Sequence, residues 1–206
     1  MSAWGEAGIA AVVLAAGRSA RMGAGSKLLL PHPTDGLPLL HHAVAGVLAL
    51  EPSEIIVVIR TDLPQLTTAL AGLPVRLVPN VEYAAGMSTS LRAGIASLLP
   101  AVQAALVVLG DTPAVPPAVF SALLAAYQRD SRPITLPVYG DVPGPPTLFA
   151  RTAFAAIATL TGDQGARPLA AVHPTWVTRV PLPADWQPAD IDTPADYDAF
   201  RAMGDA

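Results

Sequence analysis

The sequence contains no cysteine, which excludes disulfide bonds and thiolate metal sites and agrees with a cytoplasmic protein. Charged residues are also scarce, at 14% of the chain against 52% hydrophobic residues. A disordered chain shows the opposite balance, so we expect a folded protein with a sizeable core. Since the formal net charge is -4, there is no broad basic surface to bind nucleic acid.

Long hydrophobic runs, internal repeats and recognisable domain linkers are missing as well. Residues 1–8 have no basic region, and the apolar run that follows them is short, which predicts neither a signal peptide nor a membrane span. A chain of 206 residues is large enough for one domain. We therefore expect a flexible N-terminal tail over residues 1–8, a single domain over residues 9–206, and no contact with a membrane.

A glycine-rich and basic stretch, LAAGRSARMGAGSK, extends from Leu14 to Lys27. Its glycines are Gly17, Gly23 and Gly25, and its cations are Arg18, Arg21 and Lys27. Glycines let successive backbone N–H groups point into one concavity, and the cations add charge, so the stretch predicts a loop that binds a triphosphate. Its spacing matches neither a Walker loop nor the dinucleotide fingerprint G-x-G-x-x-G. The alternative is a surface loop that is basic by chance.

Short apolar runs alternate with helical segments along the chain. We expect strands over residues 9–14, 54–59, 75–78, 105–109, 134–138 and 177–180, helices over residues 38–50, 61–72, 88–99, 116–129 and 151–160, and a last helix after Thr193. Segment 140–149, which is rich in glycine and proline, predicts a rigid loop. Right-handed crossovers produce a parallel sheet of the α/β class, and ligands bind beyond the carboxyl ends of its strands.

The segment from Asn80 to Leu91 follows the third expected strand and allows two interpretations. The Asn80 amide and the N–H groups around Gly86 can border the same crevice as the first loop and recognise a base or substrate. Alternatively, Asn80 makes a turn and Ser88 is the N-cap of the next helix, with Ser90 as a second candidate. The spacing leaves both interpretations open.

Two carboxylates indicate a metal site. Asp111 follows the fourth expected strand in the motif GDTP, where it can hold a divalent cation against phosphate oxygens or, alternatively, only begin a turn. Near the C-terminus, Thr193 and Asp196 have the spacing of a capping box, which explains Asp196 but not Asp192. We expect Asp192 to complete a metal site with Asp111, and Asp190 is a weaker candidate.

Two further features have local explanations. The adjacent His41 and His42 point about 100° apart on a helix, so they do not easily face one metal, and we interpret both as ordinary side chains. Arg167, in the motif GDQGAR, can reach an anionic ligand or can be a solvated cation near a helix start.

Six motifs cover most of the chain in order: LAAGRSARMGAGSK, Asn80 with GMSTSL, GDTP, GPPTLF, GDQGAR and DIDTPADY. This assembly resembles the molybdenum cofactor nucleotidyltransferases, a branch of the nucleotide-diphospho-sugar transferase-like superfamily. The resemblance implies a single-domain Rossmann-like α/β/α fold of three layers with a mostly parallel sheet. It also implies an enzyme that binds a nucleoside triphosphate with Mg²⁺ and transfers a nucleotidyl group to a phosphate acceptor.

The motif LAAG resembles the cytidylyltransferase branch, because the guanylyltransferase branch usually has a second glycine where Ala16 stands. We therefore expect CTP rather than GTP as the donor, molybdopterin or the molybdenum cofactor as the acceptor, and an apo-molybdoenzyme as a partner that receives the product. Pro145 departs from the histidine common in relatives, and Thr112 from a longer side chain. The alternatives are guanylyl transfer, a sugar or alditol phosphate acceptor, and a molybdenum cofactor carrier without chemistry.

The expected site combines these segments. Lys27, Arg21 and Asp111 are expected to act in catalysis: Lys27 on the phosphates, Arg21 with Arg18 on the departing pyrophosphate, and Asp111 with Asp192 on Mg²⁺. The residues expected to bind the nucleotide are Leu14, Ala15, Ala16, Gly17, Arg18, Ser19, Arg21, Met22, Gly23, Lys27, Asn80, Gly86, Ser88 and Ser90.

Overall fold

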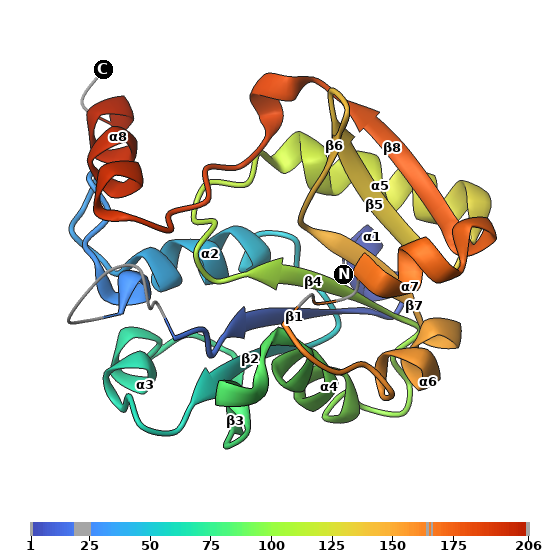
Figure 1. Cartoon of the computed structure of the whole chain (residues 1–206), viewed down its shortest axis with the longest axis horizontal. Coiled ribbons are helices and arrows are strands. Elements are labelled where there is room, and N and C mark those ends of the chain that lie inside the picture. Colours follow the sequence, from blue (N-terminus) through green and yellow to red (C-terminus); the bar gives the residue numbers. More distant parts are fainter. Residues whose placement is uncertain (1, 19–25, 164, 166, 205–206) are drawn as a thin grey trace.

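The computed structural model describes residues 2–18, 26–163, 165 and 167–204, and within these ranges one sheet forms the middle layer of an α/β/α sandwich (Figure 1). Its strands are β1 (Ile9–Ala15), β2 (Ile55–Arg60), β3 (Arg76–Asn80), β4 (Ala104–Leu109), β5 (Ile134–Tyr139), β6 (Val142–Pro143), β7 (Thr147–Ala150) and β8 (Val177–Leu182). They follow the order β3-β2-β1-β4-β7-β5-β6, and β8 pairs with β5. The expected α/β fold with a mostly parallel sheet is confirmed.

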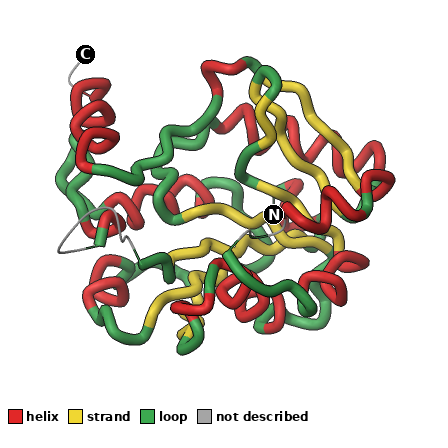
Figure 2. Tube along the Cα trace, in the orientation of Figure 1, coloured by secondary structure: helices red, strands yellow, loops and turns green. Residues whose placement is uncertain are grey.

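Helices cover both faces of this sheet (Figure 2). They are α1 (Ala3–Glu6), α2 (Leu39–Leu48), α3 (Gln65–Ala69), α4 (Met87–Ala96), α5 (Pro117–Asp130), α6 (Phe154–Ile157), α7 (Arg167–Val172) and α8 (Pro194–Gly204). Successive side chains of β1 point to opposite faces of the sheet, so the strand contributes to a core on each face. Val13 belongs to the core with α2, α3 and α5, whereas Val12 belongs to the second core with α4, α6 and α7. Across the described ranges, no helix has the length and apolar character that crossing a membrane requires.

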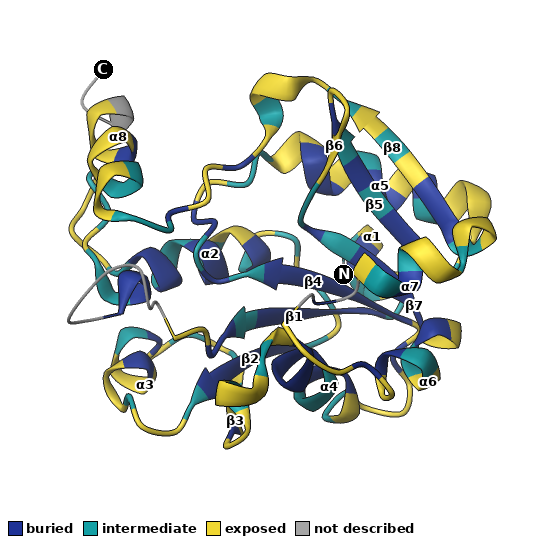
Figure 3. Cartoon of the chain, viewed as in Figure 1, coloured by how far each residue is buried: buried dark blue, intermediate teal, exposed yellow. Residues whose placement is uncertain are grey.

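The strands at the centre of the sheet are buried along nearly their whole length (Figure 3). Residues of β1 and β4 alternate between the two cores, so both faces of each strand exclude water. This is why these segments are continuous apolar runs and do not alternate between polar and apolar residues. All six strands expected from the sequence are present, with bounds that differ by one or two residues.

The prediction of a loop over residues 140–149 is wrong, because this segment contains β6 and most of β7. Strand β7 runs antiparallel to β4 and also to β5, and thus joins the two parallel parts of the sheet. Its four residues follow glycine and proline, which favour turns. The apolar run was too short to indicate a strand beside these residues. The sheet is therefore mixed at this position.

A flexible tail is expected over residues 1–8, but the described part of this segment makes defined contacts with the rest of the protein. Ala3–Glu6 form α1, and the Ser2 hydroxyl accepts a hydrogen bond from the Gly5 N–H at 3.2 Å. Trp4 is only 6% exposed and belongs to the core on the α2 side. Burial of this large aromatic side chain attaches a segment that is too short to be a stable helix alone.

Gly94 sets the distance between α4 and the sheet. A β-carbon built at this position would meet the Val12 side chain closely and would lie 3.1 Å from Cγ2 of Val58. Both valines are completely buried in the centre of the sheet. The absence of a side chain at Gly94 therefore allows the helix to pack directly on β1 and β2.

We expect Gly94→Ala to lower the free energy of unfolding by about 1–3 kcal/mol, because the added methyl overpacks a core that cannot expand. The matched control is Gly46→Ala on α2, where the added β-carbon meets no atom within 4 Å. Alanine there should stabilise the protein by about 0.5–1 kcal/mol through helix propensity. Urea unfolding followed by circular dichroism measures both changes, and equal effects of the two substitutions would contradict the packing argument.

Candidate active site

A cavity of about 400 Å³ opens at the carboxyl edge of the sheet, where β1 and β4 end. Its volume lies in the range of small-molecule sites. Its walls come from the segment after β1, from the turn before α4 and from the segments around residues 111, 163 and 192. The lining residues are Leu14, Ala16, Gly17, Arg18, Lys27, Leu28, Tyr83, Gly86, Met87, Ser90, Leu109, Asp111, Asp163 and Asp192.

Most of the described residues expected at the site do line this cavity. They are Leu14, Ala16, Gly17, Arg18, Lys27, Gly86, Ser90, Asp111 and Asp192. Ala15, Asn80 and Ser88 are buried and do not line it. The expected residues Ser19, Arg21, Met22 and Gly23 lie outside the described residues.

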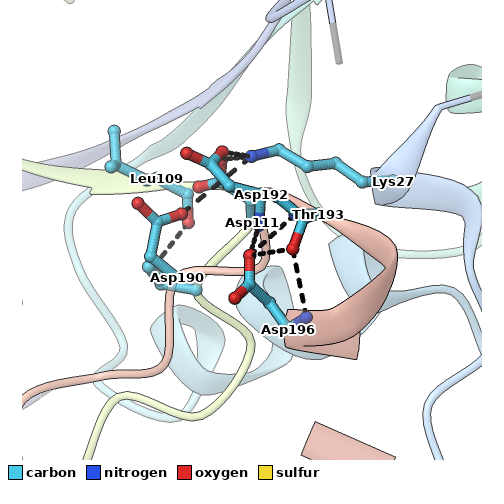
Figure 4. A network of polar contacts seen from close by, with 8 residues as sticks. Lys27, Leu109, Asp111, Asp190, Asp192, Thr193 and Asp196 are labelled. Atoms are coloured by element: carbon cyan, nitrogen blue, oxygen red, sulfur yellow. Dashed lines mark hydrogen bonds and ion pairs between the residues drawn. The ribbon is translucent and has the colours of Figure 1, made fainter. Parts of the chain in front are cut away.

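Lys27 is the only lysine in the sequence, and its ammonium group lies among three carboxylates (Figure 4). The Nζ atom is 2.6 Å from Oδ2 of Asp111 and 2.5 Å from Oδ1 of Asp192, and it is 3.9 Å from Oδ1 of Asp190. The Lys27 side chain is 9% exposed. Segments far apart in the sequence thus converge on one buried cation.

The charge on Lys27 is stabilised by these contacts. Burial lowers the pKa of its ammonium group. The attraction and hydrogen bond of Asp111, followed by those of Asp192, raise this pKa by more than burial lowers it, so the net pKa lies above the ordinary value. The resulting contribution to stability is fully present at neutral pH and is lost as the pH rises through the raised pKa of the folded state.

The same carboxylates fit a divalent cation. Asp111, Asp190 and Asp192 each place one oxygen within 4.8 Å of the others. The Oδ1 atom of Asp111 is buried and accepts no hydrogen bond from the residues that the structure describes. A buried carboxylate oxygen needs a partner, and a set of oxygen donors suits Mg²⁺ or Mn²⁺.

A capping box at the start of α8 positions Asp192. The Asp196 carboxylate accepts hydrogen bonds from the Thr193 N–H at 2.7 Å and from the Asp192 N–H at 3.1 Å, while the Asp196 N–H donates to the Thr193 hydroxyl at 3.2 Å. The expected structural role of Asp196 is confirmed. Because the backbone of Asp192 is held in this way, its carboxylate reaches the Lys27 ammonium from the C-terminal part of the chain.

The prediction that Ser88 is the N-cap of α4 is wrong. The helix begins at Met87, with Gly86 at the N-cap position and a φ of 112°. Its first N–H groups are satisfied by a distant segment, since Met87 donates to the Asp163 carboxylate at 2.9 Å and Ser88 donates to the Gly162 carbonyl at 3.2 Å. Ser88 itself lies fully buried in the first turn.

Asn80 stabilises the turn that leads into α4. Its amide donates to the hydroxyls of Thr89 and Ser90, both at 2.9 Å, and its carbonyl oxygen accepts from the Glu82 N–H at 2.9 Å. These three bonds match the turn interpretation of Asn80 and use both amide protons. Asn80 therefore reaches the cavity only through Ser90, which lines it.

Tyr83 is a lining residue that the sequence reasoning missed. Its hydroxyl donates to Asp62 at 2.7 Å, and the Arg60 guanidinium lies 4.7 Å from the centre of its ring. Arg60 also makes two hydrogen bonds of 2.6 Å to Asp62, and these bonds, followed by that of Tyr83, lower the pKa of the Asp62 carboxyl. The position of an aromatic residue three places after Asn80 was the sequence feature that could have indicated Tyr83 as a lining residue.

Replacement of Lys27 tests the competition between its ammonium group and a metal ion. We expect Lys27→Met to bind Mn²⁺ about tenfold more tightly in the absence of nucleotide, because the carboxylates lose a competing cation. Titration of Mn²⁺ followed by electron paramagnetic resonance measures this affinity. Lys27→Arg keeps the charge and is the control, and an unchanged or weaker affinity of Lys27→Met would contradict the competition.

Comparison with known proteins places this chain in a family. A model of the MobA-like NTP transferase domain matches residues 11–177. The bifunctional protein GlmU of Sphingopyxis alaskensis is 33% identical over 143 residues, which cover 69% of this chain and 31% of that protein. The chain spans less than a third of the length of the curated relatives that it matches.

Solved structures show the same fold over nearly the whole chain. An Rv0371c homologue from Mycobacterium sp. strain JC1 has a TM-score of 0.83 and 26% identity, with 96% of each chain covered. Rv0371c of Mycobacterium tuberculosis H37Rv in complex with manganese has a TM-score of 0.78 and 28% identity, with 94% of this chain and 98% of that chain covered. Since the family model matches most of its residues, this chain belongs to the family of MobA-like NTP transferase domains.

Proposed function

We propose that this protein transfers a nucleotidyl group from a nucleoside triphosphate to a phosphate acceptor, with release of pyrophosphate. One observation carries the proposal: Asp111 and Asp192 converge in the lining of the cavity, and a buried oxygen of Asp111 lacks a partner among the described residues. Family membership and the fold shared with solved structures support nucleotidyltransferase activity.

The protein's own groups provide binding and charge. Asp111 and Asp192 would hold Mg²⁺ or Mn²⁺, and the manganese complex of a relative supports a divalent metal in this family. A cation bound there supplies positive charge to the phosphates during transfer. Lys27, which then exchanges its carboxylate partners for phosphate oxygens, adds a second positive charge. Arg18 lines the same cavity, and we propose Arg21 as its partner on the departing pyrophosphate.

The reaction needs no covalent intermediate on the protein. A phosphate acceptor is itself the nucleophile and is ionised near neutral pH, so it can attack the α-phosphorus of the nucleotide directly. Orientation and neutralisation of charge are the main contributions that a protein makes to such transfers. The contacts of Lys27, Asp111 and Asp192 are of this kind.

We further propose CTP as the donor, and the terminal phosphate of molybdopterin or the molybdenum cofactor as the acceptor. The donor rests on the LAAG motif, in which Ala16 lines the cavity where the other branch has a second glycine. The acceptor rests on the order of the six motifs. An apo-molybdoenzyme that receives the product and a cytoplasmic location belong to the same proposal.

A second candidate is nucleotidyl transfer to a sugar phosphate or an alditol phosphate. This candidate is favoured by Pro145, because the molybdenum cofactor nucleotidyltransferases commonly have at this position a histidine that can contact the acceptor. The carbonyl of Pro145 accepts a hydrogen bond from the Tyr139 hydroxyl at 2.8 Å, so this part of the chain is bound to β5. A panel of phosphate acceptors with CTP separates the two candidates.

We expect pyrophosphate release from CTP with Mg²⁺ and molybdopterin, and we expect Asp111→Asn to lower its rate roughly 10²-fold or more, because one preorganised charged group is lost. The variant should retain its fold at lower stability, since Asp111 lies beyond the end of β4 and Lys27 keeps its contact with Asp192. Asp141→Asn, a carboxylate on an exposed turn, is the matched control and should leave the rate unchanged.

Other outcomes distinguish the alternatives. Release from GTP alone would overturn the choice of donor but keep the reaction, and release only with a sugar phosphate would favour the second candidate. If neither nucleotide reacts and the protein still binds the molybdenum cofactor, a carrier without chemistry becomes the better proposal. An Asp111→Asn variant that unfolds would show that the residue is structural.

A further inference from the structure

A second group of potential metal ligands lies outside the cavity, on α2 and on the turn that precedes it. His32 and Asp35 come from the turn of residues 31–38, and His42 comes from the first turns of α2. One ligand atom from each of the three residues lies within 4.8 Å of the others. The prediction from the sequence weighed His42 only against its neighbour His41, whereas the fold brings it to His32.

The two imidazoles and the carboxylate are in direct contact. The rings of His32 and His42 stack with their centres 3.8 Å apart, and Nε2 of His42 is 2.9 Å from Oδ1 of Asp35. Both histidine side chains are partly exposed, so an ion from solvent can reach them. Three protein ligands would leave further coordination positions of a bound ion open to water.

The turn is held in place by its own hydrogen bonds. Pro31 and Pro38 form an antiparallel bridge, and the His32 N–H donates to the Leu37 carbonyl at 2.7 Å. The Thr34 N–H donates to Nδ1 of His32 at 3.2 Å, a bond that a metal ion on that nitrogen would replace. The Leu37 N–H donates to the Asp35 carboxylate at 3.0 Å. Such contacts orient ligands before a metal arrives, which reduces the entropy lost on binding.

The chemistry of this group differs from that of the active-site carboxylates. Two nitrogen donors with one oxygen donor suit a borderline transition metal such as Zn²⁺, whereas oxygen donors alone suit Mg²⁺ or Mn²⁺. The two groups would therefore select different ions.

We propose that His32, Asp35 and His42 form a second metal site, which takes Zn²⁺ or a similar transition-metal ion and is separate from the Mg²⁺ site of the proposed reaction. The site lies against α8, because the His32 ring makes an edge contact with Phe200 at 5.2 Å between ring centres. The Tyr197 hydroxyl also donates to the Pro31 carbonyl at 2.6 Å. A metal ion there would fasten the turn and α2 beside the helix that follows Asp192.

The test is Zn²⁺ binding to the full chain without a histidine tag, measured by competition with a chromophoric chelator. We expect one site in the wild type, and we expect His32→Gln and His42→Gln each to weaken it roughly tenfold or more. His173→Gln is the matched control, because His173 stacks on Trp176 and belongs to no such group among the residues that the structure describes. Asp111→Asn should keep Zn²⁺ binding, since it alters only the active-site carboxylates.

A second readout does not depend on affinity. Co²⁺ added to the wild type should produce visible absorption from nitrogen ligation, and His42→Gln should abolish it. Should a histidine variant fail to fold, Asp35→Asn replaces it, because Asp35 is exposed. Equal Zn²⁺ affinity in the wild type and both histidine variants would overturn the proposal, and so would loss of Zn²⁺ binding in Asp111→Asn. Neither result affects the proposed nucleotidyl transfer.

Discussion

The contact of the Lys27 ammonium group with the carboxylates of Asp111 and Asp192 is the interaction on which the site depends. It joins the segment after β1, the end of β4 and the segment before α8, which are separated by up to 165 residues. Charges that are largely removed from water are tolerated only when they are paired. The groups that hold the three segments together are therefore also groups that line the cavity.

The sheet explains why these groups meet at one edge. Strands β1 and β4 are parallel neighbours, so their carboxyl ends lie side by side, and Lys27 and Asp111 follow these ends. The close packing of α4 at Gly94 places the first turn of that helix at the same edge. Backbone geometry thus supplies one wall of the cavity, and charged side chains supply another.

The wall formed by α4 is built from contacts between distant segments. Gly86 has a positive φ, and a β-carbon there would lie 2.6 Å from the Gly162 carbonyl group, so only glycine allows this approach. Asp163 then satisfies the N-terminus of α4, while Asn80 holds the preceding turn. Ser90 and Tyr83 face the cavity because this framework positions them.

Six of the strands, the convergence of the carboxylates at residues 111 and 192, and the capping box of α8 could be predicted from the sequence. These features depend on local periodicity and on short spacings between residues, which can be recognised in the sequence without knowledge of the fold. Tertiary structure alone decided that Lys27 pairs with those carboxylates, that Asp163 rather than Ser88 caps α4, that β7 inserts antiparallel beside β4, and that His42 meets His32. Each of these contacts joins residues that are far apart in the chain. No local sequence pattern specifies such a contact, because it forms only when the packed fold brings the two segments together.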